Sequence, residues 1–90
     1  MIGKKLSEFV DELYYNPEIE FIYDGKRYMI SGYMVEDCYV LEMCNINANT
    51  ILFEVSSASR NDCVTAFENA TIFNGQTIYE VEKNIQVLYG

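Results

Sequence analysis

The dipeptide Asp24-Gly25 constrains the fold of this chain more than any other feature. It separates two runs rich in aromatic and β-branched residues, Glu18–Tyr23 and Lys26–Ser31. Asp-Gly accepts the positive φ angles of a two-residue type I′ turn, so the two runs are predicted to form a β-hairpin. One face of this hairpin is apolar and the other is mixed, as in an antiparallel sheet with one wetted face. The turn also predicts the cross-strand pairs: Tyr23 with Lys26, Phe21 with Tyr28, Ile19 with Ile30, Glu20 with Met29 and Ile22 with Arg27.

Alternating residues continue beyond the hairpin and predict two further strands. The second strand is expected to bend or bulge at Gly32 and to end at a turn formed by Glu36-Asp37. A third strand covers Cys38–Cys44, the asparagine-rich Asn45–Asn49 connects it, and a fourth strand covers Thr50–Ser56. Four consecutive strands with short connections form an antiparallel meander.

Helical spacing of apolar residues appears on both sides of the strands. Lys4–Tyr15 has the pattern of an amphipathic helix that ends before Pro17. Ser59, Asn61 or Asp62 caps a second helix that runs to about Ala70, and Thr77 with Glu80 has the form of a capping box for a third. Ile85–Tyr89 fits either the end of that helix or a strand.

The sequence therefore predicts one α+β domain over residues 1–90. Its expected architecture is a four-stranded antiparallel meander with helices packed on one face, in the order α-β-β-β-β-α-α.

The charge of the chain is strongly negative and unevenly distributed. The formal net charge is -8, and no Lys or Arg occurs between Tyr28 and Ser59. This imbalance disfavours direct binding to nucleic acids and to membranes, because such binding draws its affinity from basic side chains. It favours a basic protein surface, or a cation, as partner. The alternative is that the charge serves solubility alone. The acids of this basic-free interval are Glu36, Asp37, Glu42 and Glu54.

The usual residues of catalytic and metal sites are absent or wrongly spaced. The chain has no histidine, and its cysteines, Cys38, Cys44 and Cys63, form no C-x-x-C pair. We therefore predict no enzyme activity, no cofactor and no metal, and interpret the cysteines as small buried apolar side chains. Their odd number, with no secretory signal and no run of transmembrane length, predicts a cytoplasmic protein.

Eight tyrosines exceed what a small core can enclose with every hydroxyl satisfied, so some should reach the surface. Tyrosine beside carboxylates is common in protein-binding patches, although these rings could equally cover the rim of the sheet. Glu8, Asp11 and Glu12 on the first helix form a second acidic patch. The predicted partner-binding residues are Glu36, Asp37, Glu42, Glu54, Tyr39 and Tyr33.

Two segments carry a family resemblance, namely the hairpin Glu18–Tyr28 and the tail Cys63–Glu82. Together they resemble a group of short proteins of Gram-positive bacteria and of their phages and mobile elements. That group has no assigned activity. The resemblance therefore implies a source and supplies no catalytic residues.

Two functions remain open at this point. The first is a non-enzymatic binding module that blocks a basic, nucleic-acid-binding site on a host protein, by analogy with phage inhibitors such as anti-CRISPR proteins that imitate DNA. The second is a homo-oligomeric protein that binds or sequesters a small ligand. There Thr50–Ser56 is an edge strand that pairs with a second copy, and tyrosines line a pocket at the seam.

Overall fold

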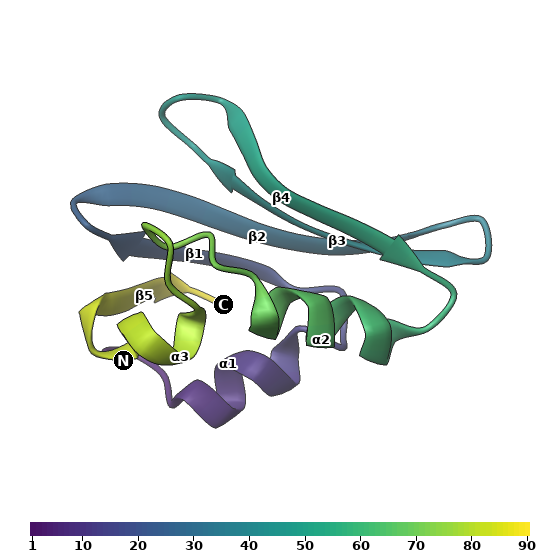
Figure 1. Ribbon diagram of the computed structural model, residues 1–90, viewed down its shortest axis with the longest axis horizontal. Helices are drawn as coiled ribbons and strands as arrows, with labels where there is room; N and C mark the ends of the chain where they lie inside the picture. Colours follow the sequence, from purple (N-terminus) through teal and green to yellow (C-terminus); the bar gives the residue numbers. More distant parts are fainter.

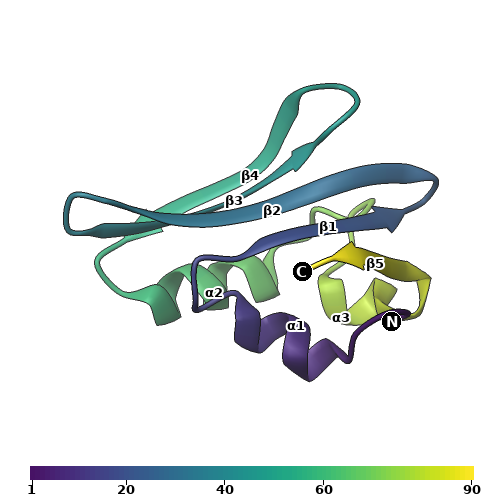
Figure 2. The same cartoon turned by 180° about the vertical axis from the view of Figure 1, so that it is seen from behind.

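The computed structural model describes all 90 residues and shows a five-stranded antiparallel sheet with the helices on one side of it (Figures 1 and 2). The strand order across the sheet is β4-β3-β2-β1-β5. The α+β class and the helices on one face are confirmed. The elements are α1 (Leu6–Glu12), β1 (Glu18–Tyr23), β2 (Lys26–Val35), β3 (Cys38–Asn45), β4 (Thr50–Ser57), α2 (Arg60–Asn69), α3 (Ile78–Val81), the 3-10 helix η1 (Glu82–Asn84) and β5 (Ile85–Tyr89).

The β1–β2 hairpin forms with the register that its turn predicts. Asp24 and Gly25 have φ angles of 53° and 74°, which are the positive values of a type I′ turn. All five predicted cross-strand pairs occur, from Tyr23 opposite Lys26 to Ile19 opposite Ile30. The turn and the alternating strands thus fix this part of the fold locally.

Gly32 does not mark a bulge, which corrects the prediction. The register of β2 against β3 runs through it without interruption. Instead, its amide donates to the carbonyl of Pro17 at 3.0 Å. A Cβ atom at position 32 would overlap the hydroxyl of Tyr39 and the ring of Pro17. Glycine is therefore required here for close approach of the chain. The register shifts of the sheet lie instead between β3 and β4, beside Leu52, and between β1 and β5, beside Leu88.

The four-stranded prediction is wrong because Ile85–Tyr89 is a fifth strand. It pairs with β1 and places Ile85 opposite Tyr23. The outer edge of β5 is in turn bonded to Ile2, whose amide donates to the Ile85 carbonyl at 2.9 Å and whose carbonyl accepts from the Val87 amide at 2.8 Å. One edge of the sheet is thus covered by the first residues, while β4 forms the other edge.

The helices cover the inner face of the sheet and enclose the core with it. Phe67 of α2 is fully buried and contacts the rings of Phe9, Phe53 and Phe73. The core thereby joins α1, α2 and β4 with the loop before α3. Seventeen buried side chains make up this cluster.

The helix starts follow the predicted caps. Ser59 caps α2, since its hydroxyl oxygen accepts from the Asp62 amide at 3.2 Å. Glu80 accepts from the Thr77 amide at 2.9 Å, which is one half of the predicted capping box. The first helix is shorter than predicted, Leu6–Glu12. None of the helices has the length and apolar composition needed to cross a membrane.

Candidate functional site

The outer face of the sheet carries no helix, and Figure 2 shows it open along its length. Toward its β4 edge, Glu42 of β3 lies directly opposite Glu54 of β4. On the other side of Glu42, Tyr33 of β2 donates its hydroxyl to the Glu42 carboxylate at 3.4 Å. Strand alternation and pairing register place these three side chains together. We call Tyr33, Glu42 and Glu54 the acidic face.

The two opposed carboxylates have no basic neighbour in the protein. Only two of the six basic side chains pair with an acidic one, Lys4 with Glu12 and Arg27 with Glu20. Arg27 and Glu20 lie on β2 and β1 and thus neutralise each other away from Glu54. Partial burial raises the pKa of Glu42 above its ordinary value, and the neighbouring Glu54 carboxylate raises it further. A cation supplied from outside would therefore be stabilised at the acidic face.

The other predicted acids lie at the end of this face. Glu36 and Asp37 form the exposed turn between β2 and β3, and Glu36 has a φ angle of 56°. Glu42 follows four residues into β3. The structure therefore brings together Tyr33, Glu42 and Glu54 and leaves the two turn acids as a neighbouring group.

Tyr39 is not a surface residue, and its prediction as a partner contact is wrong. Its side chain is fully buried, and its hydroxyl donates to the Leu13 carbonyl at 2.6 Å and accepts from the Asn16 amide at 3.2 Å. The guanidinium of Arg60 lies 4.4 Å from the centre of its ring. The reason is strand alternation, which places Tyr39 on the inner face beside Leu41.

The cysteines differ in exposure. Cys63 is buried, as predicted, Cys44 is half-buried, and Cys38 is exposed beside the β2–β3 turn. The expectation of a buried apolar role is therefore wrong for Cys38. No group of three or more His, Cys, Asp or Glu side chains is arranged to hold a metal ion.

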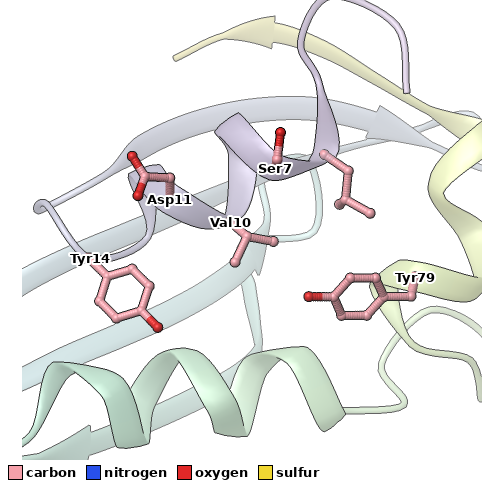
Figure 3. Close-up of a pocket in the computed structure, with 6 residues that line it drawn as sticks. Ser7, Val10, Asp11, Tyr14 and Tyr79 are labelled. Atoms are coloured by element: carbon pink, nitrogen blue, oxygen red, sulfur yellow. The ribbon is translucent and has the colours of Figure 1, made fainter.

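Sequence reasoning missed a groove on the helical side of the molecule, where α1 approaches α3 (Figure 3). Its volume is about 440 Å³. A tyrosine-lined pocket was expected at the β4 edge, but the two groove tyrosines come from the turn after α1 and from α3. The groove is lined by Leu6, Ser7, Val10, Asp11, Tyr14 and Tyr79.

Hydrogen bonds hold both groove tyrosines. The Tyr79 hydroxyl donates to the carboxylate of Glu68 on α2, and this bond raises the pKa of Tyr79 to about 12. The Tyr14 hydroxyl donates to Asn61 Oδ1 at 3.0 Å. Leu6, Val10 and Tyr14 follow one another at helical i, i+4 spacing, which was the one sequence signal for this stripe. No sequence pattern around Tyr79 indicates that its side chain lies in the same groove as Leu6, Val10 and Tyr14.

No protein family, curated protein or solved structure matches the chain.

Proposed function

We propose that this protein is a non-enzymatic binding module whose acidic face docks on a basic protein surface. The observation that carries the proposal is the opposed pair Glu42 and Glu54 on a helix-free face, without a basic partner of its own. Like charges directly opposite each other on neighbouring strands destabilise a sheet. A Lys or Arg of a partner placed between them would turn this repulsion into attraction.

The surroundings of the pair strengthen the effect of such a contact. Val40, which pairs with Tyr33 on the same face, is buried although it lies outside the core cluster. Tyr33 itself is 38% exposed and supplies aromatic area beside the acids. Apolar neighbours that exclude water raise the strength of a charge contact, and tyrosine is enriched at protein interfaces.

The class of partner follows from the charge. Proteins that bind nucleic acids present basic surfaces to phosphate groups, and an acidic protein can occupy the same surface. We therefore propose a phage-type inhibitor that blocks a host nucleic-acid-binding defence protein by charge mimicry. Glu36 and Asp37 extend the acidic face toward one end of the sheet. The free thiols favour action in a reducing compartment such as the cytoplasm.

The test is capture of partners on the immobilised protein from the lysate of a Gram-positive host at about 50 and 300 mM salt. A captured partner is then purified, and displacement of an oligonucleotide from it is followed by fluorescence anisotropy. We expect about tenfold weaker displacement at the higher salt and a similar loss for the double variant Glu42→Gln/Glu54→Gln.

A matched control removes two negative charges from the helical side. The variant Glu8→Gln/Glu80→Gln keeps its cap hydrogen bonds, since glutamine replaces glutamate in a capping box, and should displace the oligonucleotide as well as the natural protein. Equal losses in both double variants would show that net charge, rather than this face, drives binding. Displacement indifferent to salt would also contradict the proposal.

A second candidate is a homodimer through β4 that sequesters a small ligand. It is favoured by the contrast between the sheet edges, since β5 is bonded to Ile2 while β4 is an edge with one charge, Glu54. The bulge beside Leu52 and the charge of -8 on each copy oppose it. Sedimentation at high micromolar concentration decides, since a dimer supports this candidate and a monomer excludes it.

A further inference from the structure

The groove between α1 and α3 offers hydrogen-bond acceptors above an apolar floor. Leu6 and Val10 supply the floor, and both are half-buried. Figure 3 shows Tyr14 and Tyr79 on either side of Val10, with the Tyr79 hydroxyl directed across the groove. Tyr79 is 48% exposed, so its ring remains accessible from solvent.

The tyrosine hydroxyls cannot serve as donors to a ligand without losing bonds within the protein. The Tyr14 proton is directed to Asn61 Oδ1 and the Tyr79 proton to the Glu68 carboxylate. Each phenol oxygen therefore presents lone pairs to the groove. Glu68 itself has a second carboxylate oxygen, which makes no other hydrogen bond.

Asp11 adds a full negative charge at the groove. No hydrogen bond or ion pair engages its side chain, and none of the six basic side chains of the chain lines the groove. Arg60 lies in the neighbouring hollow, where it donates to the Tyr14 carbonyl and to Asn16 Oδ1. The groove thus has an apolar floor, and hydrogen-bond acceptors lie along its rim.

We propose that this groove binds an arginine side chain presented by a partner protein. The aliphatic stem would lie on Leu6 and Val10, and the planar guanidinium would stack against the tyrosine rings with its five donors facing Asp11, Glu68 and the phenol oxygens. Arg60 shows the same chemistry inside this protein, since its guanidinium lies 4.4 Å from the Tyr39 ring centre. The site is on the other side of the molecule from the acidic face and does not depend on the proposed function.

The experiment is a titration of the protein, followed by backbone amide chemical shifts, with N-acetyl-arginine amide. This probe has the side chain and the blocked backbone of an arginine within a protein. We expect binding with a dissociation constant of about 1 mM, with shift changes centred on Val10, Tyr14, Glu68 and Tyr79. N-acetyl-citrulline amide has nearly the same shape without the charge and should bind at least about tenfold more weakly.

Variants separate this groove from general attraction to an acidic protein. Tyr79→Ala should weaken binding about tenfold and Asp11→Asn about threefold. Their matched controls are Tyr89→Ala, an exposed tyrosine on β5, and Glu18→Gln, an exposed acid at the start of β1, and both should bind as the natural protein does. Thermal unfolding of each variant verifies that it is folded.

Three results would overturn the proposal. Equal affinity for the citrulline compound would show that the charge is not recognised. Shift changes centred away from the groove, or unaffected by Tyr79→Ala, would place the binding elsewhere. Tighter binding of free arginine than of the blocked amide would identify the amino acid itself, rather than a protein side chain, as the occupant.

Discussion

The two faces of the sheet are built from the same strands and have opposite chemistry. On the inner face, Phe21, Ile30 and Met43 are fully buried beneath the helices. On the outer face, which no helix covers, Glu42 and Glu54 oppose each other. Because side chains alternate along a strand, one face can supply the stability of the fold while the other keeps charges that the fold does not need.

The largest expected effect on stability comes from removing a core side chain on the inner, helix-covered side of the sheet. Phe67→Ala should lower the free energy of unfolding by about 3–5 kcal/mol, because it leaves a cavity among the rings of Phe9, Phe53 and Phe73. Urea unfolding followed by circular dichroism measures the loss.

The matched change on the outer face is Tyr33→Ala, which should cost less than about 1 kcal/mol because that ring is partly exposed. A loss of stability for Tyr33→Ala as large as that for Phe67→Ala would contradict the assignment of the fold's stability to the inner face. It would mean that something, such as a second copy, covers the outer face in solution.

A smaller effect separates two tyrosines that belong to opposite faces. Tyr39→Phe removes the hydroxyl that bonds the Leu13 carbonyl and the Asn16 amide, which join the end of α1 to β3. Leaving buried polar groups without a partner should cost about 1–3 kcal/mol. Tyr33→Phe, which loses one long bond at the surface, should stay within about 0.5 kcal/mol of the natural protein in the same urea experiment. Equal costs would contradict the placement of Tyr39 in the core.

The smallest expected effect has the opposite sign and concerns the acidic face. The pKa of Glu42 is higher in the folded protein than its ordinary value, because of partial burial and the nearby Glu54 carboxylate. The folded state thus binds the Glu42 proton more tightly than the unfolded state does. The stability that this proton contributes is fully present below the pKa of the unfolded state, and it is lost as the pH rises through the pKa of the folded state. At pH 7 the ionised pair therefore destabilises the sheet.

Glu42→Gln should accordingly raise the free energy of unfolding at pH 7, by at most about 1 kcal/mol because solvent screens the pair. Its advantage should shrink as the pH is lowered toward 4. Glu18→Gln is the control, since Glu18 lies opposite Ser31 rather than an acid, and should give no such gain. Urea titrations at several pH values measure both variants, and a gain independent of pH would argue against repulsion as the cause.

Local patterns predicted the parts of the fold whose partners are close in the chain. The Asp24-Gly25 turn and the alternating residues around it gave the register of β1 and β2. The pairing of Glu42 with Glu54 was not predicted, because it depends on the bulge between β3 and β4. Strand β5 was not predicted as a strand, because helical spacing relates the residues Ile78, Val81, Ile85 and Leu88. Its partner strand, β1, lies near the other end of the sequence. A pattern along the chain does not report such a distant pairing.

The candidate sites also divide into residues that local patterns indicate and residues that only tertiary packing brings together. Tyr33 and the acids beside it could be found from strand alternation, whereas Tyr39 was assigned to the surface by composition although its alternation with Leu41 indicated the core. The groove could not be predicted, because Tyr14 and Tyr79 meet only when α1 and α3 pack on the same side of the sheet. Tertiary packing, rather than local preference, creates that site.

The close approach at Gly32 has a consequence for how sequences related to this one can vary. Three separate segments meet there, since a side chain on residue 32 would collide with both Tyr39 and Pro17. Position 32 can therefore gain a side chain only together with a change at position 39 or 17, whatever happens to the charges on the surface. A descendant that has gained a larger residue at position 32 must carry a compensating change at one of the other two, which gives a covariation signature for recognising distant relatives.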